Sequence, residues 1–317
     1  MSVLITGGCG FIGRHLARAL TGRGEDVVLF DAAPLAPGEV SRLIGPRVTA
    51  IAGDISQRDA VSGVMRRCRP GTVIHAAAIV GVAPTAHAPR HAAGTNILGA
   101  LNVFEAASEH AVRRVVDLSS EEVYGHFPVD PIAEEVAGKP VSPYGISKHA
   151  AEQFGGYYAD QQRFSYVAAR LCWVYGPEFP RQRLPLPWLA DAVRGRASVL
   201  EHGGDQRIDF TYVTDAVQGI LRLHDAPALR YRAYNVATGT GTSLRELAAL
   251  MHSLWPRWSA KLGGGPLRLA PGVEAATKGA LSIERIEREL GYRPQVTLAD
   301  GLRRTYDWIV RAQRERP

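Results

Sequence analysis

The first half of the chain alternates short apolar runs with segments whose apolar residues recur at helical spacing. The runs cover residues 3–6, 27–31, 48–52, 73–75 and 113–119 and are almost continuously apolar. Strands that are covered on both faces of a sheet have this composition. Helical patterns lie between the runs, for example at residues 11–20 and 96–107. Strands that alternate with helices in this way predict right-handed βαβ units and a parallel sheet.

The second half begins with a helical pattern at residues 144–160, which leads into a predicted strand at 166–171. Prolines at positions 177, 180, 185 and 187 then interrupt the pattern and predict loops and short helices. The chain is expected to return to the sheet near residues 234–237 and to continue with helices at 243–254, 283–290 and 298–310. The length of 317 residues suits one large α/β domain with a smaller elaboration.

Composition and charge narrow the class of protein. Apolar residues make up 46% and charged residues 21%, as in ordinary globular proteins. The net charge of +6 comes from scattered arginines, since lysine occurs only at positions 139, 148, 261 and 278. Scattered arginine predicts a solvated surface rather than a nucleic-acid interface, and an anionic substrate or cofactor is the better use of this charge.

Several other classes are not expected from the sequence. No apolar stretch is long enough to span a membrane, and the first strand begins so early that it leaves no room for a signal peptide, so we expect a cytoplasmic protein. Cys9, Cys68 and Cys172 fit no zinc motif and no disulfide framework, and the histidines lack the spacing of ligands. We therefore expect free thiols and no metal site.

A glycine-rich turn follows the first predicted strand and opens the first predicted helix. Gly7, Gly10 and Gly13 are spaced G-x-x-G-x-x-G, with Phe11 and Ile12 between the last two. Glycine permits the tight turn and lets the backbone approach a pyrophosphate, while the helix N-terminus supplies free N–H groups. Because the strand and the helix that this motif requires are both present, the turn predicts a dinucleotide site.

The ends of the next strands carry further candidates for that site. Asp31 ends the second strand, where a carboxylate accepts hydrogen bonds from the adenosine ribose and repels a 2′-phosphate. This favours NAD over NADP. Asp54 and Ile55 follow the third strand and are candidates to flank the adenine. The small side chains of Ala76, Ala77 and Ala78 follow the fourth strand and would let the backbone pack on the cofactor, although a buried turn would look the same.

Tyr144 and Lys148 are placed at i and i+4 of a predicted helix, so their side chains share one face. A nearby ammonium stabilises a phenolate and lowers the pKa of tyrosine from its ordinary value near 10. A tyrosine tuned in this way can exchange a proton with a substrate hydroxyl while a hydride moves to nicotinamide. A surface lysine one turn from a surface tyrosine is the simpler alternative.

The loop after the fifth strand carries Ser119, Ser120, Glu121 and Glu122, and such loops face the ligand crevice of a parallel sheet. Ser120 is expected to hydrogen-bond a substrate oxygen. Glu121 and Glu122 form either a solvated pair or an acid–base pair that contacts the substrate.

These motifs are joined by others in a fixed order along the chain: Asn96-Ile97-Leu98-Gly99, Val123-Tyr124-Gly125, Val174-Tyr175-Gly176-Pro177 and Asp209-Phe210-Thr211-Tyr212-Val213-Thr214-Asp215. Over nearly its whole length the chain resembles the extended short-chain dehydrogenase/reductase family, also called the NAD-dependent epimerase/dehydratase family. The resemblance implies a Ser120/Tyr144/Lys148 triad and a tightly held NAD, which Asn96 and Ser119 would also contact. It also implies a homodimer formed through helices near residues 94–109 and 144–160.

The expected architecture is therefore a Rossmann doubly wound parallel sheet with a smaller C-terminal α/β region that caps the substrate. Residues 1–171, with a returning segment at about 205–240, would bind NAD. Residues 172–204 and 241–317 would bind the substrate.

Two departures from the family pattern bear on the substrate. Trp173 stands where nucleotide-sugar members usually carry asparagine, and Ile208 stands where they carry an arginine for a diphosphate. An isoleucine offers no charge-assisted contact. Arg207 would have to compensate, but a shift of one residue along a strand points a side chain to the opposite face. Glu122 occupies the position at which dehydratase and decarboxylase members resembling this chain place a catalytic glutamate, and a glutamate that only caps a turn fits equally well.

The leading hypothesis is redox chemistry at a secondary hydroxyl or ketone of a carbohydrate-like substrate, of the nucleotide-sugar epimerase or dehydratase type. The alternative is a net NAD-dependent dehydrogenase of a free sugar, a sugar acid or another small alcohol. A non-catalytic NAD-sensing regulator on the same fold is more remote, because the tyrosine and the lysine are both present.

Overall fold

A seven-stranded parallel sheet forms the centre of the computed structural model, which describes residues 2–180 and 183–314. Its strands lie in the order β3-β2-β1-β4-β5-β6-β10, with every neighbouring pair parallel. Their bounds are Val3–Thr6 (β1), Val27–Asp31 (β2), Val48–Ala52 (β3), Thr72–His75 (β4), Arg114–Ser120 (β5), Ser165–Leu171 (β6) and Ala233–Val236 (β10). The strand order reverses between β1 and β4, and doubly wound sheets open a ligand crevice at such a reversal.

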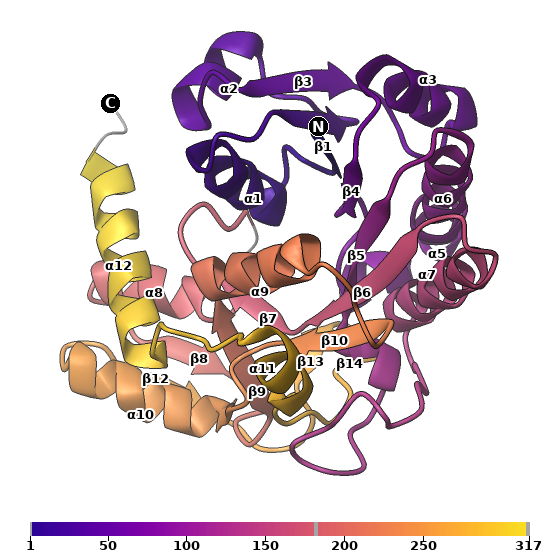
Figure 1. Cartoon of the computed structure of the whole chain (residues 1–317). Coiled ribbons are helices and arrows are strands. Elements are labelled where there is room, and N and C mark those ends of the chain that lie inside the picture. The colour runs from indigo at the N-terminus through magenta and orange to yellow at the C-terminus, as the bar shows by residue number, and fades with distance from the viewer. Residues whose placement is uncertain (1, 181–182, 315–317) are drawn as a thin grey trace.

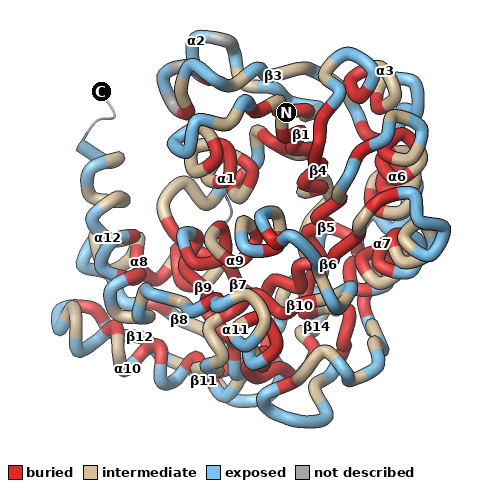
Figure 2. Tube along the Cα trace, viewed as in Figure 1, coloured by how far each residue is buried: buried red, intermediate tan, exposed pale blue. Residues whose placement is uncertain are grey.

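Helices cover both faces of this sheet, as Figure 1 shows. One face carries α1 (Phe11–Gly22) and α9 (Val213–Asp225), and the other carries α3 (Arg58–Cys68), α6 (Gly99–Glu109) and α7 (Pro143–Asp160). Each face buries its own hydrophobic cluster against the sheet. Figure 2 shows that the central strands are mostly buried and that the outer faces of the helices are exposed. The predicted Rossmann architecture is confirmed.

The predicted strand bounds agree with the structure to within one residue, but three local features differ. Strand β3 is the edge of the sheet and is half exposed, so it is not covered on both faces as its composition suggested. Helix α3 was not among the predicted helices, although Val61, Val64 and Met65 of its sequence RDAVSGVMRRC form a buried apolar stripe at helical spacing. The predicted helix at 96–107 begins with a π-helical turn, Gly94–Leu98, before α6 starts.

A smaller region is built beside the sheet from short strands and helices. Strand β7 (Trp173–Tyr175) pairs with β9 (Arg207–Tyr212), which pairs with β11 (Gly241–Ser243). The remaining strands of the region are β8 (Ser198–Leu200) with β12 (Ala260–Leu262), and β13 (Arg268–Ala270) with β14 (Val273–Glu274). Its helices are α8 (Leu186–Val193), α10 (Leu244–Leu254), α11 (Glu284–Leu290) and α12 (Leu298–Arg314).

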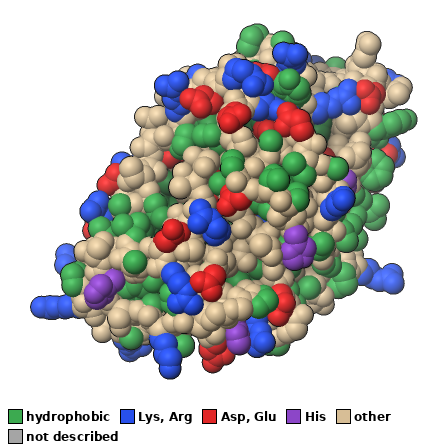
Figure 3. Space-filling view, turned by 90° about the horizontal axis from the view of Figure 1, so that it is seen from below, with side chains coloured by type: hydrophobic (Ala, Val, Ile, Leu, Met, Phe, Trp, Pro, Cys, Tyr) green, Lys and Arg blue, Asp and Glu red, His purple; other side chains and the backbone are tan. Residues whose placement is uncertain are grey.

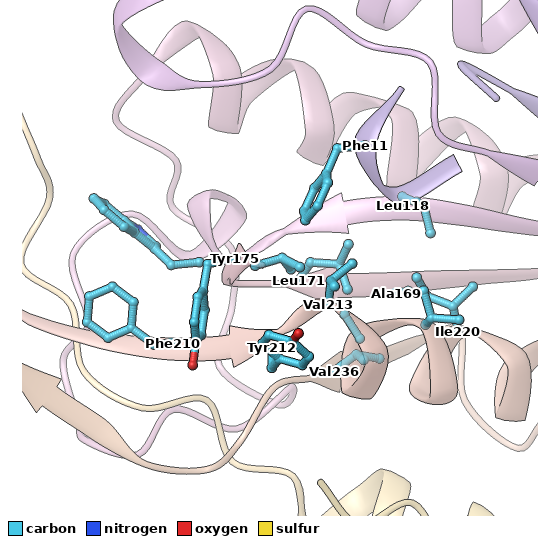
Figure 4. Close-up of a cluster of buried hydrophobic side chains, with 14 of the residues drawn as sticks. Phe11, Leu118, Ala169, Leu171, Tyr175, Phe210, Tyr212, Val213, Ile220 and Val236 are labelled. Atoms are coloured by element: carbon cyan, nitrogen blue, oxygen red, sulfur yellow. The ribbon is translucent and has the colours of Figure 1, made fainter. Parts of the chain in front are cut away.

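The returning segment divides between the two regions. Helix α9 and strand β10 belong to the large sheet and its covering layer, whereas β9 pairs with β7 and β11 in the smaller region. A cluster of buried side chains joins the regions, and Figure 4 shows Phe11 and Leu171 of the large domain beside Tyr175 and Tyr212 of the smaller one. This shared core fixes the smaller region over the carboxyl ends of the strands.

The surface carries no dominant charge of one sign on the face drawn in Figure 3, where basic and acidic side chains are interspersed.

Short helices complete the described chain: α2 (Pro37–Leu43), α4 (Val82–His87), α5 (Pro89–Ala93) and a 3₁₀ turn at Glu121–Tyr124. Among residues 2–180 and 183–314, no helix has both the length and the apolar composition needed to cross a bilayer.

Candidate active site

A cavity of about 850 Å³ opens at the carboxyl ends of the central strands, between the sheet and the smaller region. Every sequence-predicted site residue except Asn96 and Arg207 lines it. From the large domain these are Gly7, Gly10, Phe11, Ile12, Gly13, Asp31, Asp54, Ile55, Ala76, Ala77, Ala78, Ser119, Ser120, Glu121, Glu122, Tyr144 and Lys148, and from the smaller region Trp173. The sheet topology thus brings together residues that lie far apart along the chain.

The glycine turn has no room for side chains. Gly7 has a φ of +64°, and a Cβ on it would lie 2.6 Å from the backbone nitrogen of Ala77. A Cβ on Gly13 would lie 2.6 Å from the carbonyl oxygen of Gly8. Helix α1 begins directly after Gly10 without a side-chain cap, so its first N–H groups face the cavity mouth without an internal acceptor. This cradle fits the pyrophosphate of a dinucleotide.

Asp31 is held in place by two backbone hydrogen bonds at the edge of the cavity. The N–H of Cys9 donates to Oδ2 and the N–H of Ala33 donates to Oδ1, each at 3.0 Å. These contacts fix the carboxylate beside the glycine turn. The geometry suits a ribose diol and would oppose a phosphate at the same position.

Asn96 does not line the cavity. Its side chain is buried, accepts a hydrogen bond from the N–H of Ile79 at 2.7 Å, and donates to the carbonyl of Ile79 and to Oγ of Ser147 at 3.0 Å each. Both amide N–H groups and one lone pair of the oxygen are therefore used inside the protein, and a direct NAD contact of Asn96 stays a prediction. Asn96 instead ties the segment after β4, which lines the cavity, to helix α7.

Tyr144 and Lys148 lie in the first turns of α7, and both are buried at the cavity. The helix begins there because Ser142 accepts a hydrogen bond from the N–H of Gly145 at 3.1 Å and Pro143 occupies the first position. A Cβ on Gly145 would lie 2.3 Å from the carbonyl oxygen of Glu122. This close approach holds the start of α7 directly against the loop that carries Ser120 and Glu122.

The ammonium of Lys148 lies among buried charges below Tyr144. Burial lowers the pKa of Lys148, and the negative charges of Asp117 and Glu152 oppose that shift. Burial lowers the pKa of His75 to about 3, so this ring is neutral at physiological pH. Burial raises the pKa of Asp117 to about 6, which leaves its carboxylate ionised and available to stabilise the lysine charge at neutral pH.

Ser119 and Ser120 have separate partners. Oγ of Ser119 donates a hydrogen bond to Glu152 at 2.5 Å. The same carboxylate accepts hydrogen bonds from Nε and Nη2 of Arg170 at 3.0 and 2.6 Å. Ser119 is therefore part of a buried ion-pair network. In the described part of the chain, Oγ of Ser120 accepts a single long hydrogen bond, 3.3 Å, from the N–H of Glu122. Ser120 is the better placed of the two to bind a substrate oxygen.

Glu121 and Glu122 form a carboxylate pair with Lys278 at the cavity wall. The ammonium of Lys278 donates to the carbonyl oxygen of Glu121 at 3.2 Å and lies 3.6 Å from Oε1 of Glu122. Burial raises the pKa of Glu121 to about 7. Its Oε2 atom is buried without a hydrogen-bond partner in the part of the chain that the structure describes. Both residues line the cavity, and Glu121 is a carboxyl that exchanges a proton near neutral pH.

The structure shows where the two departures from the family pattern, Trp173 and Ile208, and the neighbouring Arg207 lie. Trp173 and Ile208 line the cavity, whereas Arg207 lies on the opposite side of β9, 45% exposed. Its guanidinium pairs with Asp130 at 3.2 Å and Glu246 at 3.7 Å. The structure thus argues against Arg207 as a substrate ligand. The alternation of side chains along β9 is the physical reason.

Three cationic residues of the site were missed from the sequence. Lys278, Arg183 and Arg268 line the cavity from the smaller region. The rarity of lysine in this chain was a signal for Lys278, but nothing near Arg183 distinguishes it from the many other arginines. Across residues 2–180 and 183–314, no group of histidine, cysteine and carboxylate side chains is arranged to hold a metal ion.

One cavity holds a glycine-rich strand–turn–helix together with a serine, a tyrosine and a lysine. This combination defines a dinucleotide-dependent oxidoreductase of the Rossmann type. The model of the NAD dependent epimerase/dehydratase family matches residues 3–237, and the chain belongs to this family.

Characterised and solved relatives extend over the same length. UDP-glucose 4-epimerase from Mycolicibacterium smegmatis is 28% identical over 317 residues, which cover 98% of each protein. The crystal structure of UDP-glucose 4-epimerase from Thermotoga maritima with UDP-glucose is 26% identical, has a TM-score of 0.88, and is matched over 99% of this chain and 100% of that one. A dTDP-glucose 4,6-dehydratase from Streptomyces venezuelae, solved with NAD bound, is 26% identical with a TM-score of 0.85 over 99% and 98% of the two chains.

Proposed function

We propose that this protein is an NAD-dependent enzyme that oxidises and then re-reduces or eliminates at a secondary alcohol of a sugar nucleotide, as an epimerase or a dehydratase does. The observation that carries the proposal is the single cavity, which holds the glycine turn together with Ser120, Tyr144 and Lys148. The similarity to UDP-glucose 4-epimerases and to a dTDP-glucose 4,6-dehydratase over the full chain supports the substrate class.

In this proposal the glycine turn and Asp31 hold NAD, with residues 1–171 and the returning segment as the cofactor domain. Gly7, Gly10 and Gly13 would lie against the pyrophosphate and Asp31 against the adenosine ribose. When bound, NAD supplies a reversible hydride acceptor. Residues 172–204 and 241–317 would enclose the sugar.

Tyr144 is the proton-transfer group and Lys148 sets its acidity. A phenol with an ordinary pKa near 10 is a poor base at neutral pH, and a lysine charge one helical turn away would favour its ionised form. Lys148 can keep this charge because Asp117 and Glu152 oppose the effect of its burial. Ser120 would hydrogen-bond the same substrate oxygen and hold it against the Tyr144 hydroxyl.

The Glu121–Glu122 pair supplies a second proton-transfer site. Oxidation of an alcohol to a ketone acidifies the neighbouring C–H, and a carboxylate beside that carbon can remove its proton. Glu122, whose carboxylate lies 3.6 Å from the ammonium of Lys278, is the candidate base, and Glu121, with a pKa raised to about 7 by burial, is the candidate to deliver a proton. An acid and a base at the same cavity wall favour the dehydratase branch of the proposal.

One observation favours a second candidate, a net dehydrogenase of a sugar without a nucleotide. Ile208 lines the cavity and Arg207 points away from it, so the diphosphate contact expected on β9 is missing. A free sugar or sugar acid has no need of that contact.

The two candidates leave different products. The NAD-loaded protein is incubated with UDP-glucose, UDP-glucuronate, dTDP-glucose and the corresponding free sugars, and products are identified by NMR while the NADH absorbance band is followed. A new sugar nucleotide without accumulation of NADH supports the epimerase or dehydratase. Stoichiometric NADH from a free sugar would reject that proposal in favour of the dehydrogenase.

We also propose that the protein forms a homodimer through the π-helical turn Gly94–Leu98 and the helices α6 and α7. Large apolar side chains are exposed there, namely Leu98, Ile146, Phe154 and Tyr157, and the last three lie on one face of α7. Phe154→Glu should dissociate the dimer in sedimentation experiments. Val199→Glu is the matched control, because Val199 is also apolar and is 66% exposed, but it lies on β8 of the smaller region rather than on α7. A wild-type monomer would refute the proposal.

A further inference from the structure

Arg183 lies flat on an aromatic platform inside the cavity. The centre of its guanidinium is 3.5 Å from the centroid of the Trp173 ring, and both residues line the cavity that holds Tyr144. A cation this close to an indole face is held by cation–π attraction. Arg183 thus belongs to the wall of the active site rather than to the protein surface.

The platform itself is rigid. Trp173 is 7% exposed and sits on β7, where it is paired with Phe210 of β9. The two rings also meet edge to face, with centroids 6.0 Å apart. A side chain fixed by backbone pairing and ring packing holds the guanidinium in one orientation, so less conformational entropy is lost when a ligand binds.

Stacking orients the hydrogen-bond donors of the arginine. The N–H groups of a guanidinium lie along its edge in the plane of the group, so contact through the face directs them sideways, where they match a carboxylate or a phosphate. The lining of the same cavity includes the apolar side chains of Leu184, Leu200 and Ile208, and the charge of Arg183 also acts on the buried carboxyl of Glu121, whose pKa it lowers. Partial exclusion of water strengthens a charge-assisted hydrogen bond to a ligand in such a cavity.

The other basic residues near the cavity are less suited to binding an anionic ligand. Lys278 contacts Glu121 and Glu122, and Arg207 pairs with carboxylates on the far side of β9. Arg268 lines the cavity but is exposed at the start of β13. Among these four residues, Arg183 is the one whose planar guanidinium lies over an aromatic ring, that of Trp173.

We propose that Arg183, stacked on Trp173, binds the anionic group of the substrate, either a carboxylate of a sugar acid or a phosphate of a sugar nucleotide. The inference rests on the proposed function, because the anion must belong to a molecule that also reaches Tyr144. The tryptophan that replaces the usual polar residue then has a role: it supplies the surface on which Arg183 is held.

Isothermal titration of the NAD-loaded protein tests the site with two probes, uridine diphosphate for phosphate and D-glucuronate for carboxylate. We expect one of them to bind the wild type and to bind Arg183→Gln at least about tenfold more weakly, a loss of roughly 1.4 kcal/mol. Arg183→Lys should recover only part of this loss, since lysine keeps the charge but not the planar donors. The probe whose binding falls identifies the anion.

Arg230→Gln is the matched control, because Arg230 also lies over an aromatic ring, that of Tyr231, but outside the cavity. It should leave the affinity for both probes unchanged, and the NAD affinity of all variants should match the wild type. The inference is overturned if neither probe binds the wild type, if Arg183→Gln keeps its affinity within about twofold, or if Arg268→Gln abolishes binding instead. Failure of the proposed function would be seen separately, as full turnover in Tyr144→Phe.

Discussion

Replacement of the turn glycines by alanine should weaken NAD binding, and the loss of affinity should be larger where the added Cβ has less room. A Cβ on Gly13 would lie 2.6 Å from the carbonyl oxygen of Gly8, whereas ordinary contact begins at 3.4 Å. Both atoms belong to the turn itself, so Gly13→Ala must spread the cradle by about 0.8 Å, the difference between these distances. A displacement of this size breaks at least one charge-assisted hydrogen bond to the pyrophosphate, worth about 1.5–3 kcal/mol.

This free energy corresponds to a roughly ten- to hundredfold weaker affinity for NAD. Gly10→Ala should have a smaller effect, because its Cβ would lie 3.1 Å from the carbonyl oxygen of Gly7 and a slight adjustment relieves the contact. Gly22→Ala is the matched control at the other end of α1, where nothing lies within 4 Å of the added atom. It should bind NAD as the wild type does.

The affinities are measured by titration calorimetry, with circular dichroism to confirm that each variant is folded. The reasoning is refuted if folded Gly13→Ala binds NAD within about twofold of the wild type, or if Gly22→Ala is weakened as much as Gly13→Ala. Either result would mean that the turn does not hold the pyrophosphate.

Three other changes test separate parts of the site. Glu121→Gln should be more stable than the wild type at neutral pH and should lose this advantage in acid. A carboxyl whose pKa is raised from 4.5 to about 7 by folding is protonated in both states below 4.5, and it destabilises the folded state progressively as the pH rises from 4.5 to about 7, above which the penalty is constant. Unfolding midpoints that keep a constant difference from pH 4 to 8 would contradict this assignment. Arg170→Met leaves Glu152 buried and unpaired, so it should cost about 3–5 kcal/mol in urea unfolding, whereas loss of the exposed Arg232–Asp160 pair should cost little. Asp31→Asn should lower the preference for NAD over NADP at least about tenfold in parallel titrations, and an unchanged ratio would exclude Asp31 from the ribose site.

Local patterns were sufficient to predict the strands of the large sheet. Strands buried on both faces have nearly continuous apolar runs, so β1 and β2 could be placed to the residue, and glycine spacing after β1 located the cofactor turn. Tyr144 and Lys148 were found because the four-residue spacing of a helix brings them together without help from the rest of the fold.

Features that depend on distant segments were missed or misplaced. Asn96 lies in the predicted region, but its hydrogen bonds to Ile79 and Ser147 require three segments to meet, and no pattern in its own neighbourhood indicates them. Lys278 reaches Glu121 and Glu122 across 156 or more positions of sequence, and Arg183 depends on the ring of Trp173 for its orientation. Side-chain alternation on β9 was predictable, and it correctly indicated that Arg207 faces away from the cavity.

The central claim is that Tyr144 transfers the proton in an NAD-dependent reaction, and a single comparison tests it most directly. Turnover and NAD affinity are measured side by side for the wild type and for Tyr144→Phe, which removes only one hydroxyl from a buried ring. The account predicts that turnover falls at least about a hundredfold while NAD affinity stays within about twofold. A variant that keeps its turnover would contradict the account and leave the cavity as a binding site whose chemistry, if any, does not use this tyrosine.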